Sequence, residues 1–175
     1  MTFALPSEDE PVRFRVSFIC SGNICRSPMA EVVFRDLAAQ AGHAAALSIT
    51  SAGTGDWHVG EPADARTVTA LHRAGYDGSQ HRAQQFDVEQ FDELDLVVAL
   101  DRSHQRILNA WARSDLDRAK VQLLLDFDPT RPVSRDVPDP YYSDAAQFDS
   151  VLATIERACR ALLSQLEPAL RQGAR

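Results

Sequence analysis

A cysteine and an arginine near the start of the chain are spaced so that one loop could hold and attack a phosphate group. Cys20 ends a short apolar run, and Arg26 follows six positions later, just before a helical pattern. A loop between a buried strand and a helix presents successive backbone N–H groups at the positive end of the helix dipole, which suits a phosphate dianion. The spacing alone is a weak signal, but this context favours an anion-binding loop.

The residues inside this loop have the types that such chemistry requires. Between its ends the chain reads Ser21-Gly22-Asn23-Ile24-Cys25, and Ser27-Pro28 follow. Gly22 and Asn23 tolerate the left-handed backbone that a ring of N–H groups needs. Arg26 can grip two phosphate oxygens, and its charge favours the thiolate of Cys20. A thiolate in that position is a nucleophile at neutral pH.

The loop resembles the signature of the low-molecular-weight protein tyrosine phosphatase family, which is a cysteine, five residues, an arginine and a serine near the N-terminus. Two further blocks are similar to family segments in the same order and separation. The first, a second strand and active-site wall, reads Ser51-Ala52-Gly53-Thr54-Gly55-Asp56-Trp57; the second, an acid-bearing loop, reads Asp139-Pro140-Tyr141-Tyr142. The resemblance spans most of the chain and implies a flavodoxin-like three-layer α/β sandwich. Its four-stranded parallel sheet would carry the phosphate loop after the first strand.

The resemblance also implies a reaction without metal or cofactor. Cys20 would attack phosphorus while Arg26 and the loop bind the phosphate oxygens. Asp139 would give a proton to the phenolate leaving group and later take one from water. The substrate-binding residues implied by the family are Ser21, Gly22, Asn23, Ile24, Cys25, Ser27, Trp57, Tyr141 and Tyr142. An aspartate between prolines can also be a plain turn residue.

Several supporting roles follow from the same resemblance. Ser27 would donate to the sulfur of Cys20, although its hydroxyl could instead cap the following helix. Asn23 would shape the loop with support from Ser51 and His81, and the alternative for His81 is an ordinary surface histidine. The aromatic walls would sandwich a phenyl ring. Cys25 could trap an oxidised Cys20 as a disulfide, or could simply be a small residue facing the helix.

The elements that must position these residues alternate between short apolar runs and helical patterns, which predicts a parallel α/β sheet. The expected strands are Phe14 to Cys20, Ala46 to Ser51, Leu94 to Leu100 and Val121 to Leu125. Helices are expected over Pro28 to Ala41, capped by Ser27 and stopped by Gly42, over Ala63 to Ala74, stopped by Gly75, and from a cap at Ser103 to about Ala112. A last helix carries an apolar stripe from Phe148 to Leu170 that includes Cys159. A proline-rich loop runs from Asp126 to Ser143.

The composition is that of one globular domain. The 175 residues are 45% hydrophobic, and 18 basic against 25 acidic residues give a net charge of -7. This balance disfavours binding to nucleic acid or acidic membranes. Three cysteines do not form the framework of a secreted domain, and five scattered histidines give no zinc pattern. We expect a flexible tail at residues 1–12, a single phosphatase domain at residues 13–175, a cytoplasmic location and a monomer that acts on phosphotyrosine-containing proteins.

Two other functions fit parts of the sequence. An arsenate reductase of the same fold would use the same loop and nucleophile, but the thioredoxin-linked type has two further cysteines near the middle of the chain, and residues 77–100 contain none. A phosphotyrosine-binding module would hold phosphate without turnover, although it could lose the nucleophile or the acid, which are both present. Asp101 matches a family aspartate near the loop, but Ser103-His104 follow it where serine-asparagine is usual, so no role is assigned to it.

Overall fold

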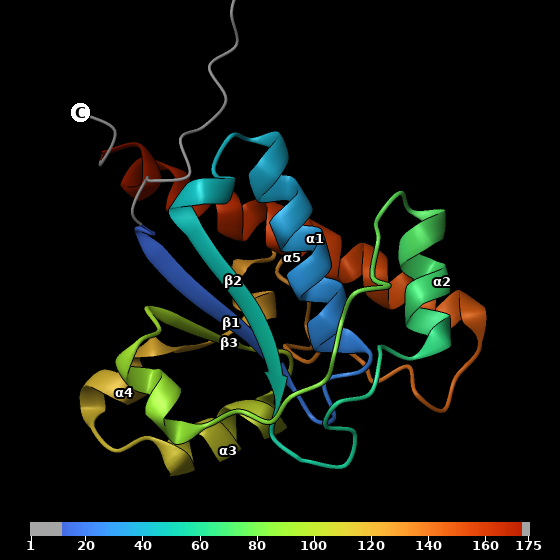
Figure 1. The fold of residues 1–175 in the computed structure, drawn as a ribbon, viewed down its shortest axis with the longest axis horizontal. Coiled ribbons are helices and arrows are strands. Elements are labelled where there is room, and N and C mark those ends of the chain that lie inside the picture. Colours follow the sequence, from blue (N-terminus) through green and yellow to red (C-terminus); the bar gives the residue numbers. More distant parts are fainter. Residues whose placement is uncertain (1–11, 173–175) are drawn as a thin grey trace, which may run out of the picture.

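Four parallel strands form the central layer of the described part of the protein. The computed structural model describes residues 12–172, and its strands are β1 (Phe14–Cys20), β2 (Leu47–Gly53), β3 (Leu96–Ala99) and β4 (Val121–Leu123). They lie in the order β2-β1-β3-β4 (Figure 1). The first strand matches the predicted range. The second reaches Gly53, because the pairing with β1 continues until Cys20 lies opposite Gly53.

Within the described residues, five α-helices cover the two faces of this sheet. They are α1 (Arg26–Gln40), α2 (Ala65–Arg73), α3 (Arg102–Trp111), α4 (Asp115–Lys120) and α5 (Ala145–Gln172). Helices α1 and α5 pack against each other, and α2 packs against α5. Short 3-10 turns occupy Ala44–Ala46, Val88–Asp92 and Leu124–Phe127. The last of these explains why β4 ends two residues earlier than predicted, and helix α4 was not predicted at all.

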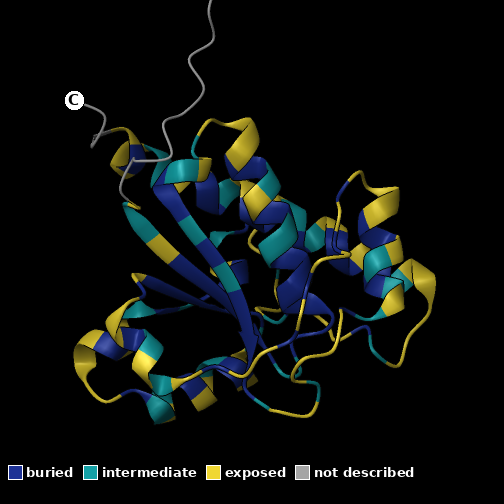
Figure 2. Cartoon of the chain, viewed as in Figure 1, coloured by how far each residue is buried: buried dark blue, intermediate teal, exposed yellow. Residues whose placement is uncertain are grey.

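Each face of the sheet has its own hydrophobic core, which makes the fold the predicted three-layer α/β sandwich. On one face Phe18 packs with buried residues of α1 and α5, such as Phe34 and Phe148. On the other face Ile19 packs with Leu108 of α3. Neighbouring residues of β1 therefore face opposite cores, as a strand buried on both sides requires. Figure 2 shows the strands as the most continuously buried part of the chain.

Two predicted helix caps are wrong. Helix α1 begins at Arg26, so Ser27 lies inside it, and the side chain of its N-cap residue, Cys25, makes no capping hydrogen bond. Helix α3 is capped by the carboxylate of Asp101, which accepts from the backbone N–H groups of Ser103 and His104. The carboxylate reaches two backbone donors from the residue before the helix, which Ser103 cannot do from within it. The predicted stops are confirmed, with positive φ angles of 80° at Gly42 and 91° at Gly75.

The structure also describes the third cysteine and the proline-rich loop that the sequence singled out. Cys159 is fully buried in the core beside α1, as the apolar stripe predicted. The predicted loop over residues 126–143 begins inside the turn Leu124–Phe127 and otherwise has no helix or strand. The predicted tail lies outside the described residues, apart from residue 12. Within residues 12–172 no helix is both long enough and apolar enough to cross a membrane.

Candidate active site

The loop between β1 and α1 is fastened from outside through its carbonyl groups. Thr54 and Gly55 donate their N–H groups to the carbonyls of Cys20 and Ser21, both at 2.9 Å. The backbone of Asp64 donates to Ile24 at 2.9 Å, and Nε2 of His81 donates to the carbonyl of Asn23 at 2.7 Å. In the described part of the chain, no protein acceptor takes a hydrogen bond from the N–H groups of residues 21–25. With the carbonyls held outward, these N–H groups are left for an anion.

Asn23 is the residue that shapes this loop. Its φ of 57° is left-handed, and its side chain is fully buried. Its amide nitrogen donates to the hydroxyls of Ser27 at 2.8 Å and Ser51 at 2.9 Å, and its amide oxygen accepts from the backbone of Gln84 at 2.9 Å. Ser51 and His81, which the family resemblance implied as support for the loop, both contact Asn23, while the contact with Gln84 was not predicted. Nothing in its residue type distinguishes Gln84 from other surface glutamines.

Two glycines make room around the loop. Gly22 does not have the left-handed backbone that its residue type permits. Its small size matters instead, because a Cβ at this position would lie 2.9 Å from Cδ2 of His58. Gly53, at the end of β2, is needed more strictly, because a Cβ would lie 2.6 Å from the carbonyl oxygen of Ser21. The loop and the end of β2 thus approach more closely than a side chain would allow.

The sulfur of Cys20 has a hydroxyl group as its neighbour. Sγ of Cys20 lies 2.9 Å from Oγ of Ser27, and both residues are buried. Ser27 accepts a hydrogen bond from Asn23, and its own proton has two acceptors within reach, the Cys20 sulfur at 2.9 Å and the carbonyl oxygen of Ala52 at 3.5 Å. The shorter contact favours donation to the sulfur. The Ser27 side chain therefore lies beside the sulfur of Cys20 and does not cap the helix.

Arg26 is held by two partners behind the cavity. Its Nη1 donates to Oδ2 of Asp101 at 2.8 Å and to the carbonyl of Val137 at 2.9 Å, and its Nη2 lies 3.7 Å from Oδ2 of Asp139. Burial alone would raise the pKa of Asp101, but hydrogen bonds from Ser103, Arg26 and the His104 backbone outweigh it and lower that pKa to about 2. Asp101 is therefore an anion that orients the guanidinium, a position that the sequence alone left without a role.

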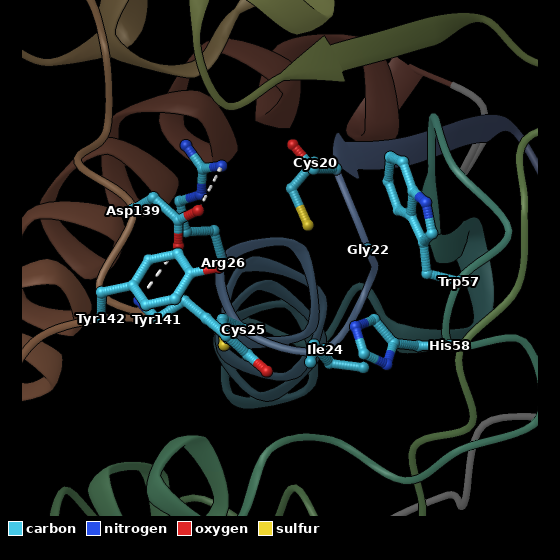
Figure 3. Close-up of a pocket in the computed structure, with 11 residues that line it drawn as sticks. Cys20, Gly22, Ile24, Cys25, Arg26, Trp57, His58, Asp139, Tyr141 and Tyr142 are labelled. Atoms are coloured by element: carbon cyan, nitrogen blue, oxygen red, sulfur yellow. Dashed lines mark hydrogen bonds and ion pairs between the residues drawn. The ribbon is translucent and has the colours of Figure 1, made fainter.

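Aromatic side chains form the two walls of a cavity of about 350 Å³ above this loop. Figure 3 shows Trp57 and His58 on one side, Tyr141 and Tyr142 on the other, and the sulfur of Cys20 between them. Trp57 and Tyr142 are 68% and 94% exposed, so they stand at the rim. Tyr141 is half-buried, with the guanidinium of Arg66 5.5 Å from its ring centre. The walls leave a slot suited to a flat ring.

The structure brings most of the predicted site residues into one cavity. Its lining contains Cys20, Ser21, Gly22, Ile24, Cys25, Arg26, Trp57, Asp139, Tyr141 and Tyr142, together with His58. Asn23 and Ser27 lie behind the loop, where their side chains support it. His58 is paired with Glu61 at 2.7 Å. Among the described residues no cluster of three or more His, Cys, Asp or Glu side chains could hold a metal ion.

Cys25 differs from Cys20 in its surroundings. It is buried against the first helix and also lines the cavity. Burial raises the pKa of the Cys25 thiol to about 12, and the neighbouring hydroxyl of Thr67 offsets this only in part. At neutral pH Cys25 is therefore a thiol and a poor nucleophile.

The fold and this loop together define a flavodoxin-like α/β protein with a phosphate-binding loop after its first strand. The family model described as low molecular weight phosphotyrosine protein phosphatase matches residues 15–172. A Streptomyces coelicolor low molecular weight protein-tyrosine-phosphatase is 49% identical over 152 residues, which cover 86% of this chain and 92% of that protein. The chain therefore belongs to the low molecular weight phosphotyrosine protein phosphatase family.

Solved structures agree with this assignment. The structure of YfkJ from Bacillus subtilis superposes with a TM-score of 0.83 at 35% identity, covering 92% of this chain and 98% of that one. A YwlE arginine phosphatase structure gives a TM-score of 0.78 at 27% identity, covering 88% and 96% of the two chains. The same fold thus also occurs in a protein described as an arginine phosphatase, so the substrate must be argued from the cavity.

Proposed function

We propose that this protein hydrolyses phosphotyrosine through a phospho-cysteine intermediate on Cys20. The observation that carries the proposal is the position of the Cys20 sulfur. It lies in the cavity between aromatic walls, together with Arg26 and the loop, whose N–H groups have no acceptor in the described part of the protein. The carbonyl contacts that fasten the loop keep its N–H groups preorganised, so binding an oxyanion needs little rearrangement.

In the first step the thiolate of Cys20 attacks phosphorus, and the bond from phosphorus to the tyrosine oxygen breaks. The loop N–H groups and Arg26 bind the three non-bridging oxygens, whose charge they balance in the transition state. Asp139, in its acid form, gives its proton to the leaving phenolate. Its position supports this role, since it lines the cavity on the same loop as Tyr141 and is half exposed.

In the second step water attacks the phosphorus of the thiophosphate. Asp139, now a carboxylate, takes a proton from this water, and the bond from sulfur to phosphorus breaks to release inorganic phosphate. The Cys20 thiolate is then the leaving group. The hydroxyl of Ser27, 2.9 Å from the sulfur, stabilises the charge that returns to it.

The walls of the cavity favour an aryl substrate. Trp57 and the two tyrosines face each other across the slot, and Ile24 adds apolar surface near the loop. A phenyl ring fills such a slot and brings its phosphate down to the loop, whereas a phosphoserine side chain is shorter and lacks the ring. Phosphotyrosine-containing proteins are therefore the proposed partners.

We also propose that residues 13–175 form a single phosphatase domain that acts as a cytoplasmic monomer, without a metal or cofactor and without binding nucleic acid or membranes. The single sheet with helices on both faces supports one domain. The net charge of -7 supports the absence of nucleic-acid and membrane binding. Light scattering after gel filtration tests the oligomeric state, since a mass near twice 19.3 kDa would contradict a monomer.

The redox role of Cys25 is a further part of the proposal. Peroxide would oxidise the Cys20 thiolate to a sulfenic acid, and the Cys25 sulfur would displace water from it to form a disulfide. Because burial keeps Cys25 protonated, we expect the disulfide to form more slowly than with an exposed thiol. Mass mapping after peroxide treatment should find the Cys20–Cys25 disulfide. Free Cys25 beside a Cys20 sulfonic acid would contradict the protective role.

Turnover of p-nitrophenyl phosphate and of a phosphotyrosine peptide, measured in the presence of a chelator, tests the main proposal. Cys20→Ser should abolish turnover while phosphate still binds, and Cys159→Ala, which removes a buried cysteine that does not line the cavity, should retain it. A phosphoserine peptide should be a poor substrate. Turnover by Cys20→Ser would overturn the proposed nucleophile. If the wild type hydrolyses neither aryl phosphate, arsenate reduction with added thiols is the next assay, followed by phosphopeptide binding.

A further inference from the structure

A chain of polar contacts joins the two ends of the phosphate loop through helix α3. Oγ of Ser21 lies 2.8 Å from Nε2 of His104, and Nδ1 of His104 lies 3.2 Å from Oδ1 of Asp101. The other carboxylate oxygen of Asp101 accepts from Arg26 at 2.8 Å. The loop residue after the nucleophile is thus connected, by way of α3, to the arginine that ends the loop.

The direction of the protons in this chain follows from its fixed members. The Asp101 carboxylate can only accept, so the Nδ1 that faces it carries the ring proton of His104. This contact is electrostatic, because Nδ1 makes no hydrogen bond of good geometry. Burial lowers the pKa of His104 to about 4, and the charge of Arg26 adds to this while Asp101 opposes it. The imidazole is neutral at pH 7, so Nε2 accepts the proton of the Ser21 hydroxyl.

Ser21 is consequently held at both its side chain and its backbone. Its hydroxyl binds α3, and its carbonyl accepts from Gly55 on the opposite side of the loop. These two contacts fix the peptide plane that follows Ser21, which carries the N–H group of Gly22. This N–H group is one of those proposed to bind phosphate oxygens, and it lies at the end of the loop away from Arg26.

We propose that Ser21 and His104 are positioning residues of the phosphate loop. Their hydrogen bond holds the N–H groups of the first loop peptides at a fixed distance and orientation relative to the guanidinium of Arg26. The inference rests on the proposed function, because it concerns how the same loop binds an oxyanion. His104 reaches the phosphate only through Ser21, and Asp101 connects His104 to Arg26. A loop anchored at one end alone would present its N–H groups and Arg26 with variable spacing.

The order serine, histidine, aspartate is also that of a hydrolase triad, in which the histidine takes the serine proton. Three observations favour positioning here. The His104 ring is only 1% exposed, so an imidazolium would lack hydration. The charge of Arg26 disfavours a second positive charge on the His104 ring. The Asp101 carboxylate already binds the guanidinium of Arg26, so it does not serve His104 alone. The chain therefore fixes geometry and does not activate Ser21.

The test compares His104→Phe, Ser21→Ala and the double variant with the wild-type protein. Each is assayed for p-nitrophenyl phosphate turnover and, without turnover, for its dissociation constant for inorganic phosphate by calorimetry. We expect each single change to lower kcat/KM and to weaken phosphate binding by about 5- to 30-fold, the effect of losing one buried hydrogen bond. The double variant should be no worse than the poorer single variant by more than about 3-fold, because both remove the same contact.

Two further variants separate positioning from general stability. His104→Gln, whose amide oxygen can accept from Ser21, should recover part of the phosphate affinity lost in His104→Phe. Leu108→Ala removes a fully buried side chain one turn further along α3, so it should lower the melting temperature without changing the phosphate dissociation constant. Should His104→Phe fail to fold, Ser21→Ala, which deletes one hydroxyl, carries the same comparison.

The proposal would be overturned if the losses of kcat/KM and of phosphate affinity in the two single variants multiplied in the double variant. It would also be overturned if Leu108→Ala bound phosphate as weakly as His104→Phe. A covalent phosphate found on Ser21 by mass spectrometry would establish the nucleophilic alternative instead. Calorimetry with inorganic phosphate does not depend on turnover. A wild-type protein that binds phosphate through this chain but hydrolyses nothing would therefore contradict the proposed function and leave the positioning role supported.

Discussion

At Asn23 we expect replacement by glycine to cost less stability than replacement by alanine, the reverse of the usual order. Its side chain makes three hydrogen bonds, to Ser27, Ser51 and the backbone of Gln84, while its backbone has a left-handed φ of 57°. Elsewhere in a protein, alanine is more favourable than glycine by roughly 0.5–1 kcal/mol, because glycine loses more backbone entropy on folding. At residue 23 the sterics of the left-handed region oppose alanine.

The magnitude follows from these contacts. Each buried hydrogen bond contributes about 1 kcal/mol, so Asn23→Gly should lower the free energy of unfolding by about 3 kcal/mol. Asn23→Ala loses the same three bonds and adds about 1 to 2 kcal/mol for a Cβ in the left-handed region. The extra backbone entropy that glycine loses, roughly 0.5–1 kcal/mol, offsets part of this difference, so Asn23→Ala should be less stable than Asn23→Gly by about 1 kcal/mol, a total loss of about 4 kcal/mol. The free energy of unfolding of a typical domain is about 5 to 15 kcal/mol, so this loss is a large fraction of the total.

Urea unfolding followed by circular dichroism, with both variants fitted to the same m value, measures the difference. Calorimetry with inorganic phosphate should also show weaker binding for Asn23→Gly, since the loop loses the contacts that fix its shape. The reasoning is refuted if Asn23→Ala is as stable as Asn23→Gly or more so. In that event the backbone at residue 23 would not be held in the left-handed region in solution.

Three other substitutions test separate parts of the structure. Ser27→Ala should slow release of the Cys20 thiolate by about 10-fold and produce a burst of p-nitrophenol in rapid mixing; a first turnover no faster than the later ones would contradict this. Asp139→Asn should slow phenyl phosphate by about 100-fold or more and p-nitrophenyl phosphate far less, and equal losses would remove Asp139 from the acid role. Asp128 is buried, and the guanidinium of Arg157 is the main cause that lowers its pKa from 3.8 to about 2. Asp128 therefore contributes about 2 kcal/mol to the free energy of unfolding above pH 4, and this contribution is lost as the pH falls toward 2. The difference in stability between wild type and Asp128→Asn should close over that range. A difference that stays constant would contradict the assigned cause.

Local patterns in the sequence were sufficient to predict the loop and the elements around it. Cys20, Arg26 and the small residues between them are neighbours in the chain, and a strand and a helix can be predicted from their periodicity. Whether the Ser27 hydroxyl serves the helix or the sulfur could not be decided in the same way. A serine suits both positions, and only the turn of α1, which begins one residue before it, aims the hydroxyl at Cys20.

The contacts from distant segments were harder to predict. Asp101 and His104 follow β3, and they meet the phosphate loop because β3 lies beside β1 in the sheet. A strand order cannot be read from residue types, so the hydrogen bond between Ser21 and His104 had no local signal. His58, which the sequence analysis did not single out, lines the cavity next to Gly22, in a contact that depends on how the chain turns after β2.

The way in which the phosphate loop is fastened also determines how its amide protons exchange with solvent. The N–H groups of Thr54 and Gly55 donate to loop carbonyls, so their exchange requires that the surrounding structure opens. Those of residues 21–25 have no protein acceptor among residues 12–172, and their exchange can proceed while the domain stays folded. Isotope labelling at these few positions would thus report whether an anion occupies the loop, and labelling at their neighbours would report whether the fold is intact.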